Sequence, residues 1–436
     1  MRVLALTLAV LAAIAGGLIL LGIRSPLQDS PPACEMRESV MEVRYRDFGP
    51  TVVVVSHPCN DAAQRPFVVF TSYIALVDGD YFTGPDPSRA LLTPRTSPYF
   101  LFRWLAHALA RHGVASVRYD PIAIRSRQPG EEGFSRTRVV EEDLLRVRRS
   151  DFSGLLSEVI AQASTALGRT ADAPIVLVSH SGGAFTVADH LDQQAARGLP
   201  RAYGFVGVSG WVDTPARITE QTKWRYWSNR LERCLGASDA QYCLKQWQAI
   251  AQYEESFVDE EIRSRLETLF SLGLTKSDLL ERVDAELSAL SERVTQARRT
   301  RMDGHSVLNG VHKINSRVLH DLHFGPANAK PISCRAKASA LIYGEEDFVL
   351  DPRSQLQAWT DACGRPAEVA VLPGLGHALG QDPYFGPPDP SAVEIVKSAI
   401  LGVASQLAAA HARPSSSTAD PPTSPSSPPP SAGMRR

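Results

Sequence analysis

The sequence has no excess of charge of either sign and no closely spaced pair of cysteines. Its 46 Lys and Arg residues are matched by 47 Asp and Glu residues, which gives a net charge of −1 over 436 residues. Without a basic excess the chain lacks the electrostatic footprint that phosphate backbones require, so we expect no nucleic-acid partner. No Cys-x-x-C motif occurs, which argues against a zinc site or a dithiol redox site.

Apolar residues are abundant, at 44% of the chain, and an uninterrupted apolar run extends from Val3 to Ile23 behind Arg2. At about 1.5 Å per residue this run reaches across the roughly 30 Å of a bilayer core, which predicts a membrane anchor. A cleaved signal peptide ending at Ala13-Ile14-Ala15 is the main alternative, and a buried core helix is a third. Anchor and signal peptide, both within residues 1–24, predict an extracytoplasmic protein, either periplasmic or secreted.

Six cysteines support export, because an even number of cysteines in an exported chain indicates disulfides. They fall into three neighbourhoods along the sequence, and we expect pairing within each: Cys34 with Cys59, Cys234 with Cys243, and Cys334 with Cys363. The argument is strongest for Cys334, because the helix expected over 353–362 returns antiparallel to the strand that follows Cys334. Six unpaired buried thiols are the alternative.

The C-terminal segment, residues 413–436, is dominated by Pro and Ser. From Pro414 to Ser431 the chain has almost nothing apolar to bury, which predicts a disordered tail.

Between these ends, strand and helix patterns alternate. A hairpin is expected first, with strands at 41–46 and 51–56, and further strands are expected at 67–71, 114–119, 175–178, 205–208, 338–343 and 368–372. Helices are expected from Ser97, where Pro98 takes the first helical position, to Gly113, and at 145–167, 184–197, 353–362 and 392–410. This order predicts an α/β fold: a mostly parallel sheet with helices on both faces, formed by residues 34–210 and 331–412.

The insert at 211–330 lacks strand patterning. Apolar residues recur there at helical spacing, which predicts amphipathic helices that cap the sheet: Leu280, Val283, Leu287, Leu290 and Val294, and on a second helix Ile262, Leu266, Leu269 and Phe270. Four of the six Trp residues lie in its first third, where they either line an apolar acyl pocket or pack the cap helices.

A nucleophile motif follows the strand at 175–178. Ser179-His180-Ser181-Gly182-Gly183 stands between this strand and a helix, and matches the small-x-Ser-x-Gly turn that exposes a serine hydroxyl. The helix N-terminus and the Gly182 amide then lie beside a developing oxyanion. Ser181 is therefore the candidate nucleophile, and His180 is expected to pack beside it.

A serine needs a base, and the base needs an acid that orients it. The strand at 338–343 is followed by Asp347, and the strand at 368–372 by Gly374-Leu375-Gly376-His377. We expect Asp347 as the acid and His377 as the base. Glu345, Glu346 and Asp351 are alternative acids.

These motifs resemble the α/β-hydrolase superfamily and, within it, the serine aminopeptidase-like carboxylesterases. The resemblance covers residues 65 to 405 and rests on Arg118-Tyr119-Asp120, on the turn at Ser181, on the helical insert, on Gly344 to Asp347 and on Gly374 to His377. It implies an α/β-hydrolase fold with a helical cap and a Ser181, Asp347, His377 catalytic triad.

Two segments depart from that family. Pro121 to Ser126 lacks the glycines that usually follow the Arg-Tyr-Asp motif, and Thr71-Ser72-Tyr73-Ile74-Ala75 stands where the family has a glycine-rich oxyanion loop. The second oxyanion donor is therefore expected from the Tyr73 amide or the Ser72 amide. Asp78-Gly79-Asp80 nearby is interpreted as a solvated turn and not as a metal site.

The sequence thus predicts a serine hydrolase that transfers the acyl group of a small ester to water, with no cofactor and with membrane contact only through its N-terminal segment. Peptide or amide hydrolysis by the same residues is one alternative. A non-catalytic binding protein with the same fold is another. The choice of substrate then depends on the shape of the cap.

Overall fold

The structure is a computed structural model. It describes residues 36–58, 65–71, 82–83, 99–126, 137–199, 201–214, 217, 232, 234–236, 243, 260–300, 304–308, 312–347, 349–381 and 388–412. The expected N-terminal anchor or signal peptide, Cys34, Cys59, Ser72, Tyr73, Asp78, Asp80 and the expected C-terminal tail lie outside these residues.

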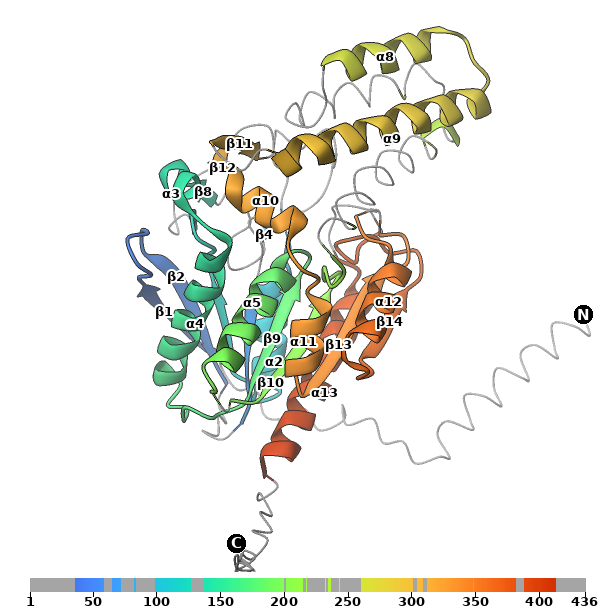
Figure 1. Cartoon of the computed structure of the whole chain (residues 1–436). Coiled ribbons are helices and arrows are strands. Elements are labelled where there is room, and N and C mark those ends of the chain that lie inside the picture. The colour runs from blue at the N-terminus through green and yellow to red at the C-terminus, as the bar shows by residue number, and fades with distance from the viewer. Residues whose placement is uncertain are drawn as a thin grey trace, which may run out of the picture.

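An eight-stranded sheet forms the centre of the molecule (Figure 1). Its strands, in spatial order, are β1 (Arg37–Val43), β2 (Thr51–His57), β6 (Ser116–Tyr119), β3 (Phe67–Thr71), β9 (Ile175–His180), β10 (Tyr203–Val208), β13 (Ala338–Gly344) and β14 (Glu368–Leu372). Strand β2 pairs antiparallel with both of its neighbours, and every other pair in this sheet is parallel. The predicted fold class, a mostly parallel sheet in an α/β protein, is confirmed.

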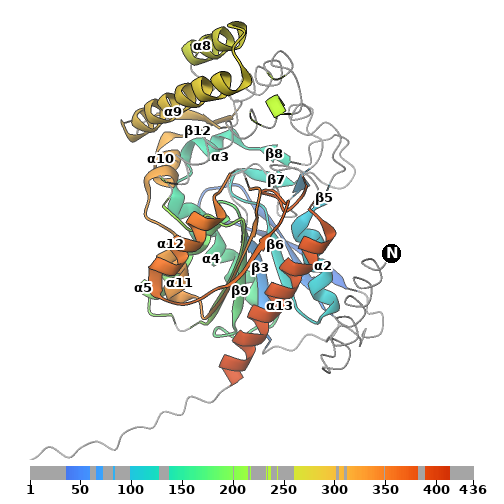
Figure 2. The ribbon, with the colours of Figure 1, turned by 90° about the vertical axis from the view of Figure 1, so that its right-hand side faces the viewer.

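Helices cover both faces of the sheet, as Figure 2 shows. One face carries α2 (Leu101–Arg111) and α13 (Pro390–Ala412), and the other carries α4 (Arg149–Ala166), α5 (Gly183–Ala196), α11 (Ala329–Arg335) and α12 (Pro352–Cys363). The central strands are buried on both sides and send alternate side chains into two cores. In β3, Val68 and Phe70 pack with α2 and α13, whereas Phe67 and Val69 pack with α4 and α5.

Among the described residues, α13 is the one helix that is long and apolar enough to cross a membrane. Its place in the fold accounts for this composition. Val396, Ile400, Val403 and Leu407 lie along one side of α13 and are buried in the core against the sheet.

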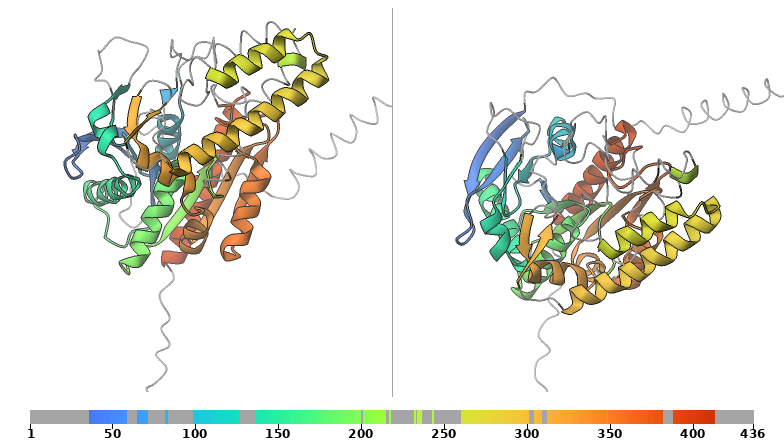
Figure 3. Two further views of the ribbon diagram at one scale, coloured as in Figure 1. Left: turned by 45° about the horizontal axis from the view of Figure 1, so that its top comes forward. Right: turned by 90° about the horizontal axis from the view of Figure 1, so that it is seen from above.

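The insert after β10 contains the expected helices, α8 (Glu260–Ser271) and α9 (Lys276–Thr300), which lie side by side outside the layered core (Figures 1 and 3). The expectation that the insert has no strands is wrong. The hairpin β11 (His305–Leu308) and β12 (His312–Asn315) follows α9, and α10 (Ser316–Phe324) follows the hairpin. The segments HSVL and HKIN contain neither an aliphatic run nor an alternation of polar and apolar residues, so the sequence does not mark them as strands. A cap over the whole of 211–330 stays a prediction, because much of the insert lies outside the described residues.

Two predicted helices have different bounds. The helix expected over 145–167 is α4, and a separate short helix, α3 (Glu141–Arg146), precedes it. The break occurs because the Asp151 side chain accepts a hydrogen bond from the backbone N–H of Arg148 at 2.8 Å, which begins a new helix there. In the other case, Tyr99–Phe100 forms strand β5 with β4 (Phe82–Thr83), so α2 begins at Leu101 and not at Pro98. The remaining pair of short strands is β7 (Ile124–Ser126) and β8 (Thr137–Val139).

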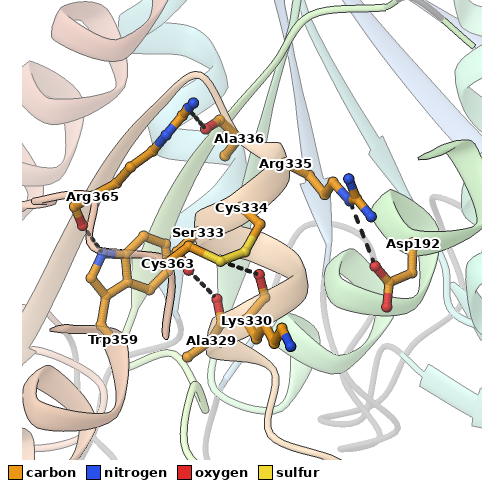
Figure 4. Close-up of a disulfide and its surroundings, with 10 residues drawn as sticks. All are labelled: Asp192, Ala329, Lys330, Ser333, Cys334, Arg335, Ala336, Trp359, Cys363 and Arg365. Carbon is orange, nitrogen blue, oxygen red and sulfur yellow. Dashed lines mark hydrogen bonds and ion pairs between the residues drawn. A yellow bond between two sulfur atoms is a disulfide. The ribbon is translucent and has the colours of Figure 1, made fainter. Parts of the chain in front are cut away.

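Two of the expected cysteine pairs lie at disulfide distance. Cys334, in α11, and Cys363, at the end of α12, have Cα atoms 5.4 Å apart, and Figure 4 shows their sulfur atoms joined. The Cα atoms of Cys234 and Cys243 are 5.7 Å apart. Both separations are within the range that a disulfide spans.

Candidate active site

Ser181 lies in a tight turn between the end of β9 and the start of α5. Its φ of 51° is in the left-handed region, which costs a non-glycine residue about 1–3 kcal/mol and persists only where the surroundings enforce it. Two backbone hydrogen bonds enforce it here. The Ser181 N–H donates to the carbonyl of Val208 at 3.0 Å, and the Ser181 carbonyl accepts from the N–H of Trp211 at 3.2 Å. The nucleophile candidate is therefore fixed to the chain that leaves β10.

Small residues on each side of Ser181 are required by close packing. A Cβ atom on Gly183 would lie 2.5 Å from the backbone oxygen of Thr71 at the end of β3, and 3.2 Å from the Cβ atom of Ser179. A backbone oxygen in a sheet cannot move aside, so position 183 needs glycine. This contact is the physical basis of the small-x-Ser-x-Gly pattern in this chain.

The loop after β14 brings His377 to Ser181. The Nε2 atom of His377 lies 3.0 Å from Ser181 Oγ, and its Nδ1 atom lies 3.0 and 2.9 Å from the two carboxylate oxygens of Asp347. His377 and Asp347 are both buried. Because the Asp347 carboxylate accepts from Nδ1–H, the lone pair of Nε2 faces Ser181, and the serine hydroxyl donates to it.

The position of Asp347 is fixed from both sides. Its Oδ1 atom accepts hydrogen bonds from the backbone N–H groups of Val349 and Leu350 at 2.8 and 2.9 Å. The turn that carries it is bonded to the loop of His377, because the N–H of Glu346 donates to the carbonyl of Leu375 at 2.9 Å. Of the alternative acids, Glu345 is exposed to solvent and Asp351 is the residue before α12.

His180, the residue before Ser181, is also in contact with His377. Its Nε2 atom lies 3.1 Å from the backbone carbonyl oxygen of His377, and the two imidazole rings pack edge to face with their centroids 5.0 Å apart. Burial lowers the pKa of His180 from 6.5 to about 3, and repulsion from His377 adds to the effect. His180 is therefore neutral at physiological pH. The sequence pattern predicted its packing beside the turn, but not its contact with the candidate base.

The expected oxyanion donors are only partly described. Gly182 is the residue before the first turn of α5, so its backbone amide stands directly beside Ser181 at a helix N-terminus, where negative charge is favoured. The Tyr73 and Ser72 amides lie outside the described residues. Among the described residues, no three His, Cys, Asp or Glu side chains group together in a way that could hold a metal ion.

The order of the strands decides the fold. Counted along the chain, the eight strands stand in the order 1, 2, 4, 3, 5, 6, 7, 8, the second strand runs opposite to the other seven, and the strained turn follows the fifth. The chain has the α/β-hydrolase fold.

No protein-family model matches the chain, and no curated protein matches it either. Solved structures similar to this α/β-hydrolase fold include a proline iminopeptidase from Mycobacterium smegmatis, with 15% identity, a TM-score of 0.42, and coverage of 85% of this chain and 100% of that one. Est1E from Butyrivibrio proteoclasticus with bound ferulic acid has 10% identity, a TM-score of 0.44, and coverage of 84% and 99%. A hyperthermophilic esterase from Pyrobaculum calidifontis has 13% identity, a TM-score of 0.41, and coverage of 85% and 84%.

Proposed function

We propose that this protein is a serine hydrolase that cleaves small carboxylic esters. The observation that supports it most directly is the unbroken hydrogen-bonded series Ser181, His377, Asp347, with contacts of 2.9 to 3.0 Å. A nucleophile, a base and an acid that orients the base, each within hydrogen-bond distance of the next, are what acyl transfer through serine needs.

In the first half of the reaction, Ser181 Oγ attacks the ester carbonyl carbon while His377 Nε2 takes the hydroxyl proton. The carbonyl oxygen becomes an oxyanion, which the Gly182 amide and an amide of the Ser72–Tyr73 segment stabilise. As the carbonyl re-forms, the bond to the alcohol oxygen breaks, and His377 gives its proton to that oxygen. The alcohol leaves, and the acyl group stays on Ser181.

In the second half, a water molecule takes the place of the serine hydroxyl. His377 removes a proton from the water as it attacks the acyl carbon, and returns that proton to Ser181 Oγ as the acid leaves. Asp347 holds the imidazole in the correct tautomer and stabilises its positive charge in both halves. These steps use no metal ion and no organic cofactor.

The disulfide-distance pairs Cys234–Cys243 and Cys334–Cys363 support an oxidising, extracytoplasmic location for this hydrolase. We propose that residues 3–23 direct the chain there, as an anchor or as a cleaved signal.

A fluorophosphonate probe tests the nucleophile, because it reacts covalently with activated serines. The wild-type protein should be labelled at Ser181, and Ser181→Ala should lose both labelling and turnover. Loss of the nucleophile in such a triad costs on the order of 10⁶ in rate. The free energy of unfolding should change by less than about 1 kcal/mol, because one hydroxyl on a turn leaves no large cavity.

A double variant tests whether Ser181 and His377 act together. His377→Ala should be about as severe as Ser181→Ala, and the double variant no worse than either, because the residues act as one unit. If Ser181→Ala hydrolyses esters at the wild-type rate, the assignment is wrong and the chain is a non-catalytic protein with a contaminating esterase. If Ser181→Ala is inactive, a panel of p-nitrophenyl esters of increasing acyl length, measured beside aminoacyl anilides, distinguishes ester hydrolysis from amide hydrolysis.

A further inference from the structure

The candidate base belongs to a loop that is remote in sequence from the strand of the nucleophile. His377 follows β14, and strands β10 and β13 separate β14 from β9 in the sheet. Backbone hydrogen bonds from Glu345 and Glu346 to the carbonyls of Leu372 and Leu375 attach this loop to the turn of Asp347. They fix the base relative to the acid. They do not fix it relative to Ser181.

A contact from His180 connects the loop to the strand of the nucleophile. A carbonyl oxygen can only accept a hydrogen bond, so at 3.1 Å from the His377 carbonyl the Nε2 atom of His180 must carry the proton. His180 is 2% exposed, and its ring packs edge to face against the ring of His377. The main chain and the side chain of His377 are therefore both in contact with the residue directly before Ser181.

A neutral His180 is compatible with the positive charge that His377 acquires during the reaction. When His377 takes the serine proton it becomes an imidazolium ion, and a second cation with its ring centroid 5.0 Å away would oppose that charge. Burial keeps His180 uncharged at physiological pH, because its pKa is lowered to about 3.

We propose that His180 is a positioning residue, which holds His377 in line with Ser181 through its N–H bond to the His377 main chain and its contact with the His377 ring. The proposal rests on the function proposed above, and it gives the position before the nucleophile a role beyond packing. A reacting group that is displaced by about 1 Å loses on the order of 100-fold in rate, so a positioning contact is measurable.

Two substitutions of similar length separate the hydrogen bond from packing. His180→Gln keeps an N–H donor near the place of Nε2, whereas His180→Met fills similar space without a donor. Turnover of p-nitrophenyl butyrate is measured per active site, with the sites counted by fluorophosphonate titration, so that misfolded protein does not lower the apparent rate. The rate of inactivation by the probe gives a second readout of the nucleophile.

His190 supplies the matched control. It is also buried and neutral, its pKa is also lowered to about 3, and it lies in α5 between the hydroxyls of Ser157 and Tyr203, at 2.9 and 3.2 Å. His190→Met removes an equally buried imidazole without touching His377, so it should lower stability and leave kcat per active site unchanged.

For His180→Met we expect kcat and the inactivation rate to fall by about 10- to 100-fold with KM nearly unchanged, because the lost contact acts on the reacting groups and not on substrate binding. His180→Gln should recover most of that loss. If His180→Met does not fold, His180→Phe, which preserves the ring volume, replaces it in the comparison with His180→Gln.

Equal kcat per active site in His180→Met and the wild type would overturn the proposal and leave His180 as core packing. Equal losses in the Met and Gln variants would overturn the role of the N–H bond. Either result would leave the proposed hydrolase function standing, because that function is tested by the Ser181→Ala variant and not by variants of His180.

Discussion

In the part of the chain that the structure describes, five non-glycine residues have a positive φ: Arg46, in the turn between β1 and β2, and four residues that follow the carboxyl ends of other strands. Ser181 after β9 has a φ of 51°, Ser209 after β10 has a φ of 44°, Ala123 after β6 has a φ of 69°, and Leu379 in the loop after β14 has a φ of 58°. Each such residue costs about 1–3 kcal/mol and needs support from its surroundings. Strain at one end of a sheet indicates that this end is shaped for a site, which agrees with the position of Ser181.

Asp347 offers a sharp test at the residue scale. Asp347→Asn should keep the hydrogen bonds from Val349 and Leu350, because an amide oxygen also accepts, so the fold should be unchanged. The amide cannot hold the imidazole in the required tautomer, so kcat should fall by about 10⁴-fold. Steady-state kinetics and the unfolding midpoint measure both effects.

Asp351→Asn is the control for this change. Asp351 is the residue before α12, and its side chain makes no capping hydrogen bond to that helix, so Asn should replace it with little effect on stability. A loss of activity in Asp351→Asn equal to that in Asp347→Asn would contradict the assignment of Asp347 as the acid.

At the scale of elements, the turn at Ser181 depends on how closely α5 approaches β3. Gly183→Ala should destabilise the protein by about 1–3 kcal/mol and lower turnover, because its Cβ atom would meet the Thr71 carbonyl, 2.5 Å away, and push the turn outward. Thermal unfolding and ester hydrolysis measure this.

Gly402→Ala in α13 is the control for this change, because it adds the same methyl group at a position with no close neighbouring atom. The nearest atom to its new Cβ would be Glu368 Oε2 at 3.9 Å. Because alanine restricts the unfolded chain more than glycine does, Gly402→Ala should stabilise the protein by about 0.4–1 kcal/mol. Similar effects of the two substitutions would show that the close approach of Gly183 is unimportant.

The cysteine pair that joins α11 to α12 has a predictable contribution to stability. Cys334 and Cys363 are 29 residues apart, and removing both should lower the free energy of unfolding by about 3.5 kcal/mol. The shorter loop between Cys234 and Cys243, 9 residues, constrains the unfolded chain less, so the corresponding double variant should lose about 1 kcal/mol less. Mass mapping of non-reduced peptides that finds these thiols free would contradict both the pairing and export.

The whole molecule should become less stable in mild acid. The pKa values of His180 and His190 are lowered by burial from 6.5 to about 3. Below pH 6.5 the unfolded chain binds protons that the folded chain does not, so stability should fall as the pH decreases from about 6.5 toward 3.

Urea unfolding at pH 7.5, 6 and 5 measures this pH dependence. The midpoint should decrease with pH in the wild type and decrease less steeply in His190→Met, which has lost one of the two groups. A midpoint that is constant or rises toward pH 5 would contradict the burial of these histidines in neutral form.

The sequence by itself determined the features that depend on neighbours along the chain. The alternation of strand and helix predicts a parallel sheet, because each βαβ unit returns the chain in one direction. The turn at 179–183 can be recognised because its requirements, small residues beside Ser181 and a strand before it, are local. The positions of Asp347 and His377 follow from the same logic, because parallel strands end at one edge of the sheet.

Only the tertiary structure decided which of these residues touch. It brings Asp347 to His377 because the backbones of two loops bond across the ends of β13 and β14, which no local pattern encodes. It also brings His180 against the backbone of a residue 197 positions away. The contact of His180 with the His377 backbone depends on the summed geometry of the packed sheet, so no local pattern of residues predicts it.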